Sequence, residues 1–170
     1  ITTALRQPGS SIKPINYGTA LERRLITAAT VIMDVPTTFA SIPKSYKPVN
    51  YDGRFHGPVQ VRYALGNSYN IPAVKVLALN TVVEMIKKAR EMGITTFEDE
   101  SRYGLSLTLG GGEVKMTDMA VAFGVFANEG TRIDLTGIAK IEDSAGRVIE
   151  EFKPKSGKKV LSSEVSFLIS

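Results

Sequence analysis

Apolar residues recur at helical spacing along much of the chain, and this pattern predicts a mainly helical molecule. The first predicted helix begins at Ser10 or Ser11 and continues to about Ile26. Pro14 falls within its first turn, where backbone N–H groups have no helical partner, so it favours this start. Gly18 permits the close approach of a neighbouring element. The apolar positions of this helix are Ile12, Ile15, Ala20 and Leu21.

Five further helices follow from the same pattern. They are predicted over residues 59–65, from Pro72 onwards, over residues 81–92 with Gly93 as the C-cap, over residues 115–128, and from Ser162 onwards. The helix over residues 115–128 has an apolar stripe that we assign to the core. Its members are Met116, Met119, Ala120, Phe123 and Phe126.

The rest of the pattern predicts a loop and a hairpin. Residues 36–58 contain four prolines and the turn sequence Asn50-Tyr51-Asp52-Gly53, which is typical of a long loop with a function. Residues 136–142 and 147–152 are strand-like and flank Asp143-Ser144-Ala145-Gly146, so they predict a β-hairpin.

Composition narrows the possible chemistry. The 170 residues indicate one domain or a large piece of one, and the absence of an initial Met favours a segment of a longer protein. With one His and no Cys, the chain is a poor candidate for a zinc site, a thiol nucleophile or a histidine-based triad, and we expect no cofactor. No apolar stretch reaches the roughly 18 residues of a membrane span. Residues 153–160 hold four lysines without stacking aromatics, which indicates a basic surface linker and no nucleic-acid partner.

A serine followed three residues later by a lysine is the strongest chemical signal. Positions i and i+3 of a helix share a face, so Lys13 can act as the base that activates the Ser10 hydroxyl. Two further matches, residues 41–44 and 156–159, are predicted to lie in a loop and in the basic segment. Only Ser10 and Lys13 open an apolar-periodic helix, and the positive field of a helix N-terminus favours an alkoxide.

A second polar motif, Ser68-Tyr69-Asn70, precedes the helix predicted from Pro72. One interpretation makes Ser68 or Asn70 the N-cap of that helix, a role that both residue types favour. The other, which the serine–lysine pair favours, makes Ser68 a hydroxyl that passes a proton and Asn70 an amide that holds a substrate carbonyl.

These motifs resemble the penicillin-binding protein transpeptidases, and specifically their bifunctional class A branch. The resemblance rests on residues 6–14 around the nucleophile, on residues 49–53, 57–59, 62–65 and 68–74, and on Leu109 to Val114 with 122–123 and 126–128. It implies an α/β (α+β) fold like that of penicillin-binding proteins and serine β-lactamases. Residues 1–170 would form a partial transpeptidase domain, mainly its helical part plus a β-hairpin, with the central antiparallel sheet largely outside this chain. The glycine run 110–112 lacks the spacing of a nucleotide-binding loop, and the resemblance makes it a packed turn.

The resemblance also implies an activity. Lys13 would deprotonate Ser10, which attacks the D-alanyl-D-alanine stem peptide of peptidoglycan, while Ser68 relays a proton and Asn70 orients the substrate; β-lactams would acylate Ser10 in the same way. We reject Lys155-Ser156-Gly157 as the family's third motif because it lies among lysines with no strand pattern after it. That motif is expected beyond Ser170, in the remaining part of the domain, so the 170-residue piece alone is expected to be inactive.

Further partners follow from the same resemblance. A membrane anchor and a glycosyltransferase module are expected before Ile1, which would place the chain on the extracytoplasmic face of the bacterial membrane. Two alternatives stay open: a serine β-lactamase, and a non-catalytic domain that senses β-lactams or wall peptides.

Overall fold

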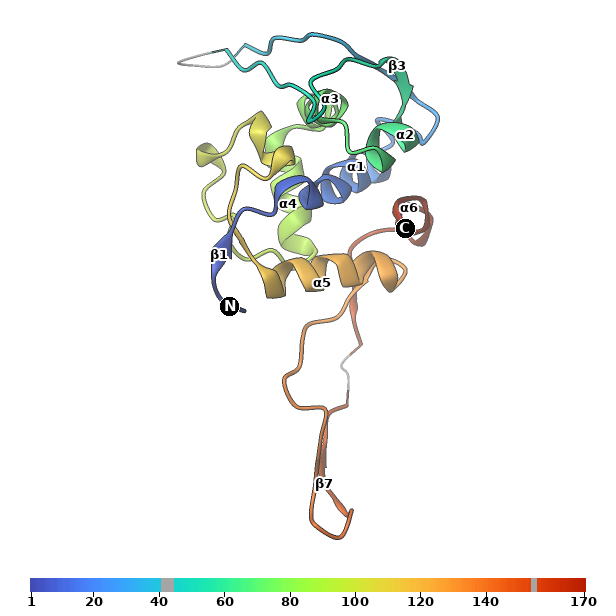
Figure 1. The fold of residues 1–170 in the computed structure, drawn as a ribbon. Helices are drawn as coiled ribbons and strands as arrows, with labels where there is room; N and C mark the ends of the chain where they lie inside the picture. Colours follow the sequence, from blue (N-terminus) through green and yellow to red (C-terminus); the bar gives the residue numbers. More distant parts are fainter. Residues whose placement is uncertain (41–44, 154–155) are drawn as a thin grey trace.

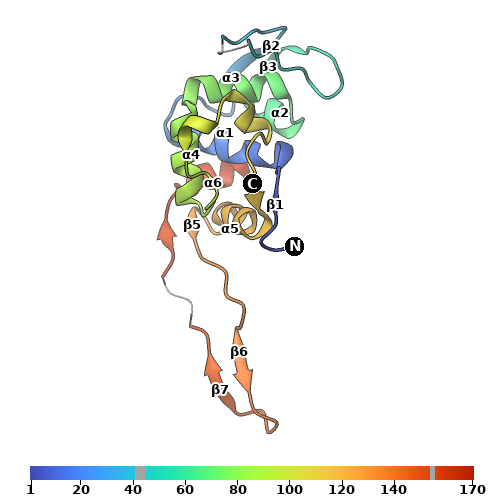
Figure 2. The same ribbon diagram turned by 90° about the vertical axis from the view of Figure 1, so that its left-hand side faces the viewer.

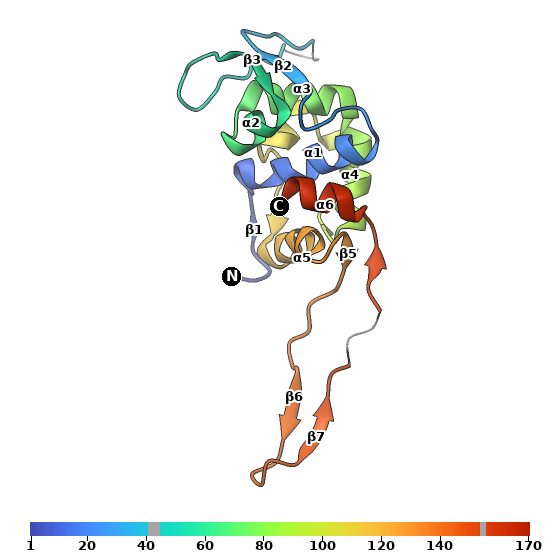
Figure 3. The ribbon, with the colours of Figure 1, turned by 90° about the vertical axis from the view of Figure 1, so that its right-hand side faces the viewer.

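The chain folds into a helical body from which a long two-stranded arm projects (Figure 1). The computed structural model describes residues 1–40, 45–153 and 156–170. The arm leaves the body after its fifth helix and returns to it before the last one, as Figures 2 and 3 show from opposite sides. The α-helices of the body are α1 (Lys13–Glu22), α2 (Val61–Gly66), α3 (Asn70–Asn80), α4 (Val82–Glu91), α5 (Met116–Ala127) and α6 (Ser163–Ile169). Its 3₁₀ helices are η1 (Gly9–Ile12), η2 (Glu100–Arg102) and η3 (Leu105–Leu109).

The described strands pair two by two, and every pair is antiparallel. The pairs are β1 (Leu5–Arg6) with β4 (Val114–Lys115), β2 (Val31–Asp34) with β3 (Gly57–Gln60), β5 (Thr131–Arg132) with β8 (Lys158–Lys159), and β6 (Lys140–Glu142) with β7 (Val148–Glu151). The predicted hairpin is confirmed: β6 and β7 enclose residues 143–147, which include the predicted turn 143–146, where Gly146 has a φ of +79°. Mixed helix and strand content agrees with the predicted α+β class.

Helix α1 lies at the centre of the body and contacts α2, α3, α4 and α6. The four apolar residues predicted to face inward are all buried. A Cβ atom built on Gly18 would lie at van der Waals distance, 3.4 Å, from Cε1 of Phe126, so the neighbour that approaches this glycine is the Phe126 side chain of α5. The helix ends at Glu22 rather than near Ile26, because Arg24 adopts a left-handed conformation (φ +57°) that stops it.

The predicted helix starts at Thr81 and Ser162 are confirmed, and the structure shows that each of these residues caps its helix. The Thr81 side chain accepts a hydrogen bond from the backbone N–H of Glu84 at the start of α4, and Gly93 follows that helix with a φ of +113°. The Ser162 side chain likewise accepts from the backbone N–H of Val165 at the start of α6. Each cap satisfies one of the backbone donors that a helix leaves free in its first turn.

The core assignment of α5 was wrong for most of the predicted stripe. Met116 is 57% exposed and Phe123 is 42% exposed, and Ala120 is exposed as well. The helix instead buries the face formed by Asp118, Ala122, Val125 and Phe126. Because α5 is apolar on nearly all sides, its periodicity could not reveal which side meets the core.

The early strands β1 to β4 were missed, since the sequence indicated strands only after residue 135. The predicted loop over residues 36–58 follows β2 and runs into β3. It is therefore a long connection between two paired strands. Residues 41–44, which include one of the unused serine–lysine matches, lie outside the described residues.

Candidate active site

The predicted nucleophile, Ser10, lies exposed in η1, a single 3₁₀ turn that leads directly into α1. Gly9 starts this turn with a φ of +58°, and Ser11 closes it by donating its hydroxyl to the Pro8 carbonyl at 2.6 Å. Residues three apart eclipse one another in a 3₁₀ helix, so Ser10 and Lys13 share one face. The predicted helix start at the serine is thus a 3₁₀ turn followed by an α-helix, with Pro14 as the second α-helical residue.

A glycine lies directly against this turn. Gly110 follows η3 with a φ of +92°, and a Cβ atom at that position would lie 2.3 Å from the backbone nitrogen of Gly9. Any side chain there would push the turn away, since real Cβ atoms do not approach so closely. The glycine run is therefore a packed turn, as predicted, and it leads through β4 into α5.

Lys13 is 1% exposed and gathers the second motif around its amine. Its Nζ atom donates to the Ser68 carbonyl at 2.6 Å, to the Ser68 hydroxyl at 3.1 Å and to Asn70 Oδ1 at 2.7 Å. Burial lowers the pKa of Lys13 from 10.5 to about 8, because desolvation disfavours the ammonium form. The lysine is thus much closer to neutrality at physiological pH than an exposed lysine would be.

The 68–70 motif lies at the start of α3, and neither of its polar side chains caps that helix. The N-cap residue is Tyr69, which makes no side-chain cap bond, and the helix begins at Asn70, two residues before the predicted Pro72. The Ser68 and Asn70 side chains are bonded to Lys13 instead, and Asn70 Nδ2 donates to the Val49 carbonyl at 2.8 Å. The cap interpretation of Ser68 and Asn70 was therefore wrong.

Ser68 has a left-handed backbone conformation, with a φ of +56°. Such a conformation is costly for a residue other than glycine and persists only where surrounding contacts impose it. Here the contacts include the bond from Lys13 Nζ to the Ser68 carbonyl. The serine hydroxyl and the lysine amine are thereby held together across 55 residues of chain.

The sequence did not identify the residue that does cap α3. Asn50 Oδ1 accepts hydrogen bonds from the backbone N–H groups of Asn70 at 2.8 Å and Ile71 at 3.4 Å. Asn50 had been assigned to a turn and to the residues that carry the family resemblance, without a role of its own, although the length of its loop did indicate a function.

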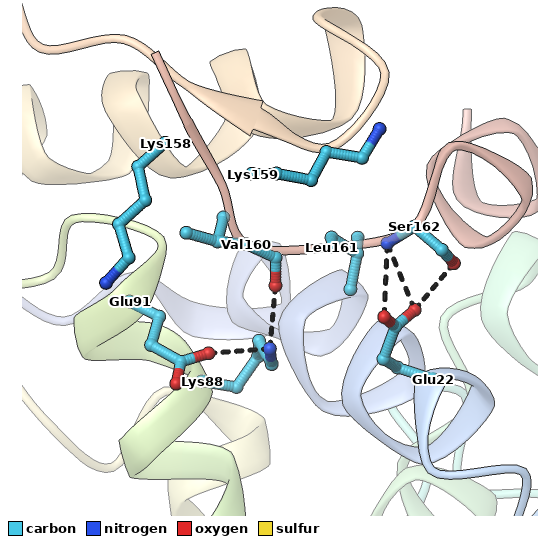
Figure 4. Close-up of a pocket in the computed structure, with 8 residues that line it drawn as sticks. All are labelled: Glu22, Lys88, Glu91, Lys158, Lys159, Val160, Leu161 and Ser162. Atoms are coloured by element: carbon cyan, nitrogen blue, oxygen red, sulfur yellow. Dashed lines mark hydrogen bonds and ion pairs between the residues drawn. The ribbon is translucent and has the colours of Figure 1, made fainter.

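A separate pocket lies beneath β8 and the start of α6, and Figure 4 shows its lining. Lys88 donates to Glu91 and to the Val160 carbonyl, while Glu22 accepts from the backbone N–H and the hydroxyl of Ser162. These polar groups satisfy one another and fasten the returning arm to α1 and α4. None of them belongs to the cluster around Lys13.

The basic segment and the rejected third motif lie where the arm returns to the body. Ser156, Gly157, Lys158 and Lys159 are exposed, and Val160 is buried. A Cβ atom on Gly157 would lie 2.6 Å from the Arg132 carbonyl, so this residue packs against β5. Residues 154–155 lie outside the described residues.

In the described part of the chain, no grouping of His, Asp and Glu side chains is suited to hold a metal ion. Over the same residues, no helix has the length and apolar character needed to cross a membrane.

The whole chain, residues 1–170, matches the profile of a family described as the penicillin-binding protein transpeptidase domain. The chain belongs to that family. Penicillin-binding protein 1C of Escherichia coli is 38% identical over 131 residues, which are 76% of this chain and 16% of that protein. Penicillin-binding protein 2D of Bacillus subtilis is 35% identical over 170 residues, which are 98% of this chain and 24% of that protein. The chain therefore spans between about a sixth and a quarter of these relatives.

Solved structures agree with this family. Penicillin-binding protein 1A from Haemophilus influenzae superposes with a TM-score of 0.87 at 28% identity, over 99% of this chain and 29% of that one. Penicillin-binding protein A from Mycobacterium tuberculosis, solved as an imipenem acyl-enzyme complex, gives a TM-score of 0.83 at 16% identity, over 99% of this chain and 43% of that one. The fold is therefore that of a penicillin-binding protein transpeptidase domain.

Proposed function

We propose that this chain carries the nucleophile and base of a peptidoglycan D,D-transpeptidase that forms a serine acyl-enzyme and is inhibited by β-lactams. The observation that carries the proposal is the buried Lys13 amine, held by Ser68 and Asn70 one turn after an exposed Ser10. The names of the relatives and the acyl-enzyme form of one structural neighbour support the same chemistry.

The hydrogen bonds of Lys13 fit both protonation states of its amine. The ammonium form donates its three N–H groups to the Ser68 carbonyl, the Ser68 hydroxyl and Asn70 Oδ1. The neutral amine keeps two N–H donors for the Ser68 carbonyl and Asn70 Oδ1, and its lone pair can then take the proton of Ser10 during attack. With a pKa of about 8, roughly one Lys13 in ten is neutral at pH 7.

The reaction proceeds in two acyl transfers. Lys13 takes the proton of Ser10 as its Oγ atom bonds to the carbonyl carbon of the penultimate D-alanine. Ser68 passes a proton to the departing amine, and the C–N bond breaks to release the terminal D-alanine. The amine of a second stem peptide then attacks the ester, forms the cross-link and restores the Ser10 hydroxyl.

Two residues shape the transition state. Asn70 orients the substrate through its side-chain amide. The backbone N–H of Ser10 donates to the oxyanion, and a second donor is expected beside the third motif of the family.

The setting of the reaction is part of the proposal. Peptidoglycan stem peptides are the substrates, and the rest of the domain, carrying the third motif, completes the cleft. We place the protein on the extracytoplasmic face of the bacterial membrane, together with a glycosyltransferase module and a membrane anchor. The much greater length of the relatives supports such additional parts.

Covalent labelling with fluorescent penicillin tests this proposal in the protein that carries this chain. We expect one label per wild-type molecule and none for Ser10→Ala. Ser11→Ala is the matched control, because Ser11 is the adjacent exposed serine and its hydroxyl bonds only to the Pro8 carbonyl among the described residues. Equal labelling of Ser10→Ala and wild type would overturn the assignment of the nucleophile.

Two other activities would use the same cluster. A serine β-lactamase would hydrolyse the acyl-enzyme, so rapid turnover of a chromogenic cephalosporin would identify it. A sensor domain would form a stable acyl-enzyme yet fail to cross-link stem peptides. Neither alternative is favoured by a specific contact in the described structure.

A further inference from the structure

A polar cluster, buried except for part of one ring, lies directly behind the Ser68–Asn70 loop, and the mechanism above does not use it. It consists of Asn50 in the long loop, Asp34 at the end of β2, and His56 just before β3. We call these three residues the support cluster. Asp34 is fully buried and Asn50 is 3% exposed, so their polar groups must find partners inside the protein.

Asn50 uses both sides of its amide. Its Nδ2 atom donates to the Asp34 carboxylate, at 3.0 and 2.7 Å from the two oxygens, and to the Arg54 carbonyl at 2.8 Å. Its Oδ1 atom accepts from the backbone N–H of Asn70 at 2.8 Å. A side chain without both a donor and an acceptor could not join the buried carboxylate to the start of α3.

The carboxylate of Asp34 is fixed in turn by His56. Asp34 Oδ2 accepts from the backbone N–H of His56 at 3.0 Å and lies 2.6 Å from His56 Nδ1. The other ring nitrogen of His56 lies 3.1 Å from Asp52 Oδ2. Asp34 also pairs with Gly57 in the β2–β3 ladder, so the paired strands provide a rigid base for the cluster.

The His56 ring contacts the loop from a second direction. It stacks on the Tyr69 ring, with centroids 3.9 Å apart and planes inclined by 14°. Tyr69 is the middle residue of the motif, between the left-handed Ser68 and Asn70. The support cluster therefore holds the loop at Tyr69 by stacking and at Asn70 by a backbone hydrogen bond.

We propose that Asn50, oriented by Asp34 and His56, is a positioning residue that fixes Ser68 and Asn70 against Lys13 for acylation. This inference rests on the proposed function. The bonds run without a break from His56 through Asp34 and Asn50 to Asn70, whose Oδ1 atom lies 2.7 Å from Lys13 Nζ. Loss of this support lets Ser68 leave its strained conformation, so the proton path becomes misaligned while the fold remains.

The test is the rate at which fluorescent penicillin acylates Asn50→Ala and His56→Ala in the protein that carries this chain. The matched control is Asn80→Ala, because Asn80 is also fully buried and bonds to Asn16 and Arg23 at the opposite end of α3. Both the limiting acylation rate at saturating penicillin and the final number of labels per molecule are measured, because they separate slow chemistry from loss of folded protein.

We expect the limiting acylation rate of Asn50→Ala to fall by about 10- to 100-fold, because a displacement of reacting groups by about 1 Å can slow a reaction by up to roughly 100-fold. The final label should still reach one per molecule, and His56→Ala should show a smaller decrease. Asn80→Ala should lower thermal stability and keep the wild-type rate. If Asn50→Ala does not fold, the rate of His56→Ala is the test, because the His56 side chain is partly exposed and its removal disturbs the core less.

Three outcomes would overturn the inference. The first is a wild-type rate in both Asn50→Ala and His56→Ala. The second is a lower final label at an unchanged rate, which would mean that the support cluster only stabilises the fold. The third is a wild-type protein in which penicillin does not label Ser10. This outcome refutes the proposed function itself, and the wild-type measurement distinguishes it from the other two.

Discussion

Replacement of Lys13 by arginine tests the assignment of the base, because arginine keeps the positive charge but does not become neutral. The guanidinium can still donate to the Ser68 carbonyl and to Asn70. Burial places the Lys13 pKa at about 8 instead of 10.5. This shift raises the neutral fraction at pH 7 roughly 300-fold, from about one in three thousand to about one in ten.

An arginine, with a pKa above about 12, is neutral in at most about one molecule in 10⁵ at pH 7. The fraction of molecules with a neutral base at position 13 therefore falls by a factor of about 10⁴ in Lys13→Arg. Since removal of a general base costs about 10² to 10⁴ in rate, we expect acylation by penicillin to slow by that factor. Stopped-flow or quenched labelling with a fluorescent penicillin measures the rate.

The wild-type pH profile gives the same test without a mutation. Below the pKa of about 8 the acylation rate should rise about tenfold per pH unit, and above it the rate should level off. Lys88→Arg is the control, because Lys88 is a partly buried lysine that pairs with Glu91 away from the site. A Lys13→Arg rate within about tenfold of wild type, or a flat profile from about pH 6 to 9, would refute the role of Lys13 as the base.

Two further predictions concern stability. Gly110→Ala should lower the free energy of unfolding by about 2–4 kcal/mol and slow acylation, because the new Cβ atom at φ +92° would meet the Gly9 backbone. Urea unfolding measures the change in stability. The control is Gly124→Ala, in open space on α5, which should raise the free energy of unfolding by up to about 1 kcal/mol. The pKa of Lys13 is lower in the folded state than in the unfolded state, so the unfolded chain binds more protons between about pH 8 and 10.5 and stability rises with pH in that window. Relative to Lys13→Met, wild type should gain roughly 2–3 kcal/mol from pH 7 to pH 11, and a constant difference between the two proteins would contradict the burial of the amine.

Local signals in the sequence were reliable guides to this fold. The caps Thr81 and Ser162, the glycine after α4 and the β6–β7 hairpin each depend on residues within a few positions of one another. The serine–lysine pair belongs to the same class, since three residues separate its members. Such features are fixed by backbone geometry and could be predicted without knowledge of the rest of the chain.

Features that depend on distant residues could not be predicted in this way. The β2–β3 ladder joins Asp34 to Gly57 across a long loop, and Asn50 caps a helix that begins 20 residues later. Neither pairing leaves a periodic trace in the sequence. For α5 the local pattern was ambiguous, because several faces of an almost wholly apolar helix could pack against the core.

The candidate site combines both kinds of information. The motifs indicated Ser10, Lys13, Ser68 and Asn70, and the structure brings the last three into direct contact. It adds the left-handed Ser68 and the packed Gly110, which are properties of the folded backbone. The support cluster also belongs to this group, because its members become neighbours only when the loop folds against α3.

Mass spectrometry that locates the penicillin adduct in the protein that carries this chain shows which residue is the nucleophile. Trypsin cuts after Arg6 and Arg23 but not between Lys13 and Pro14, so one peptide, residues 7–23, contains the proposed nucleophile. We expect that this peptide alone gains the mass of one penicillin, with fragment ions that place it on Ser10. An adduct on another residue, or none on a folded protein, would contradict this assignment.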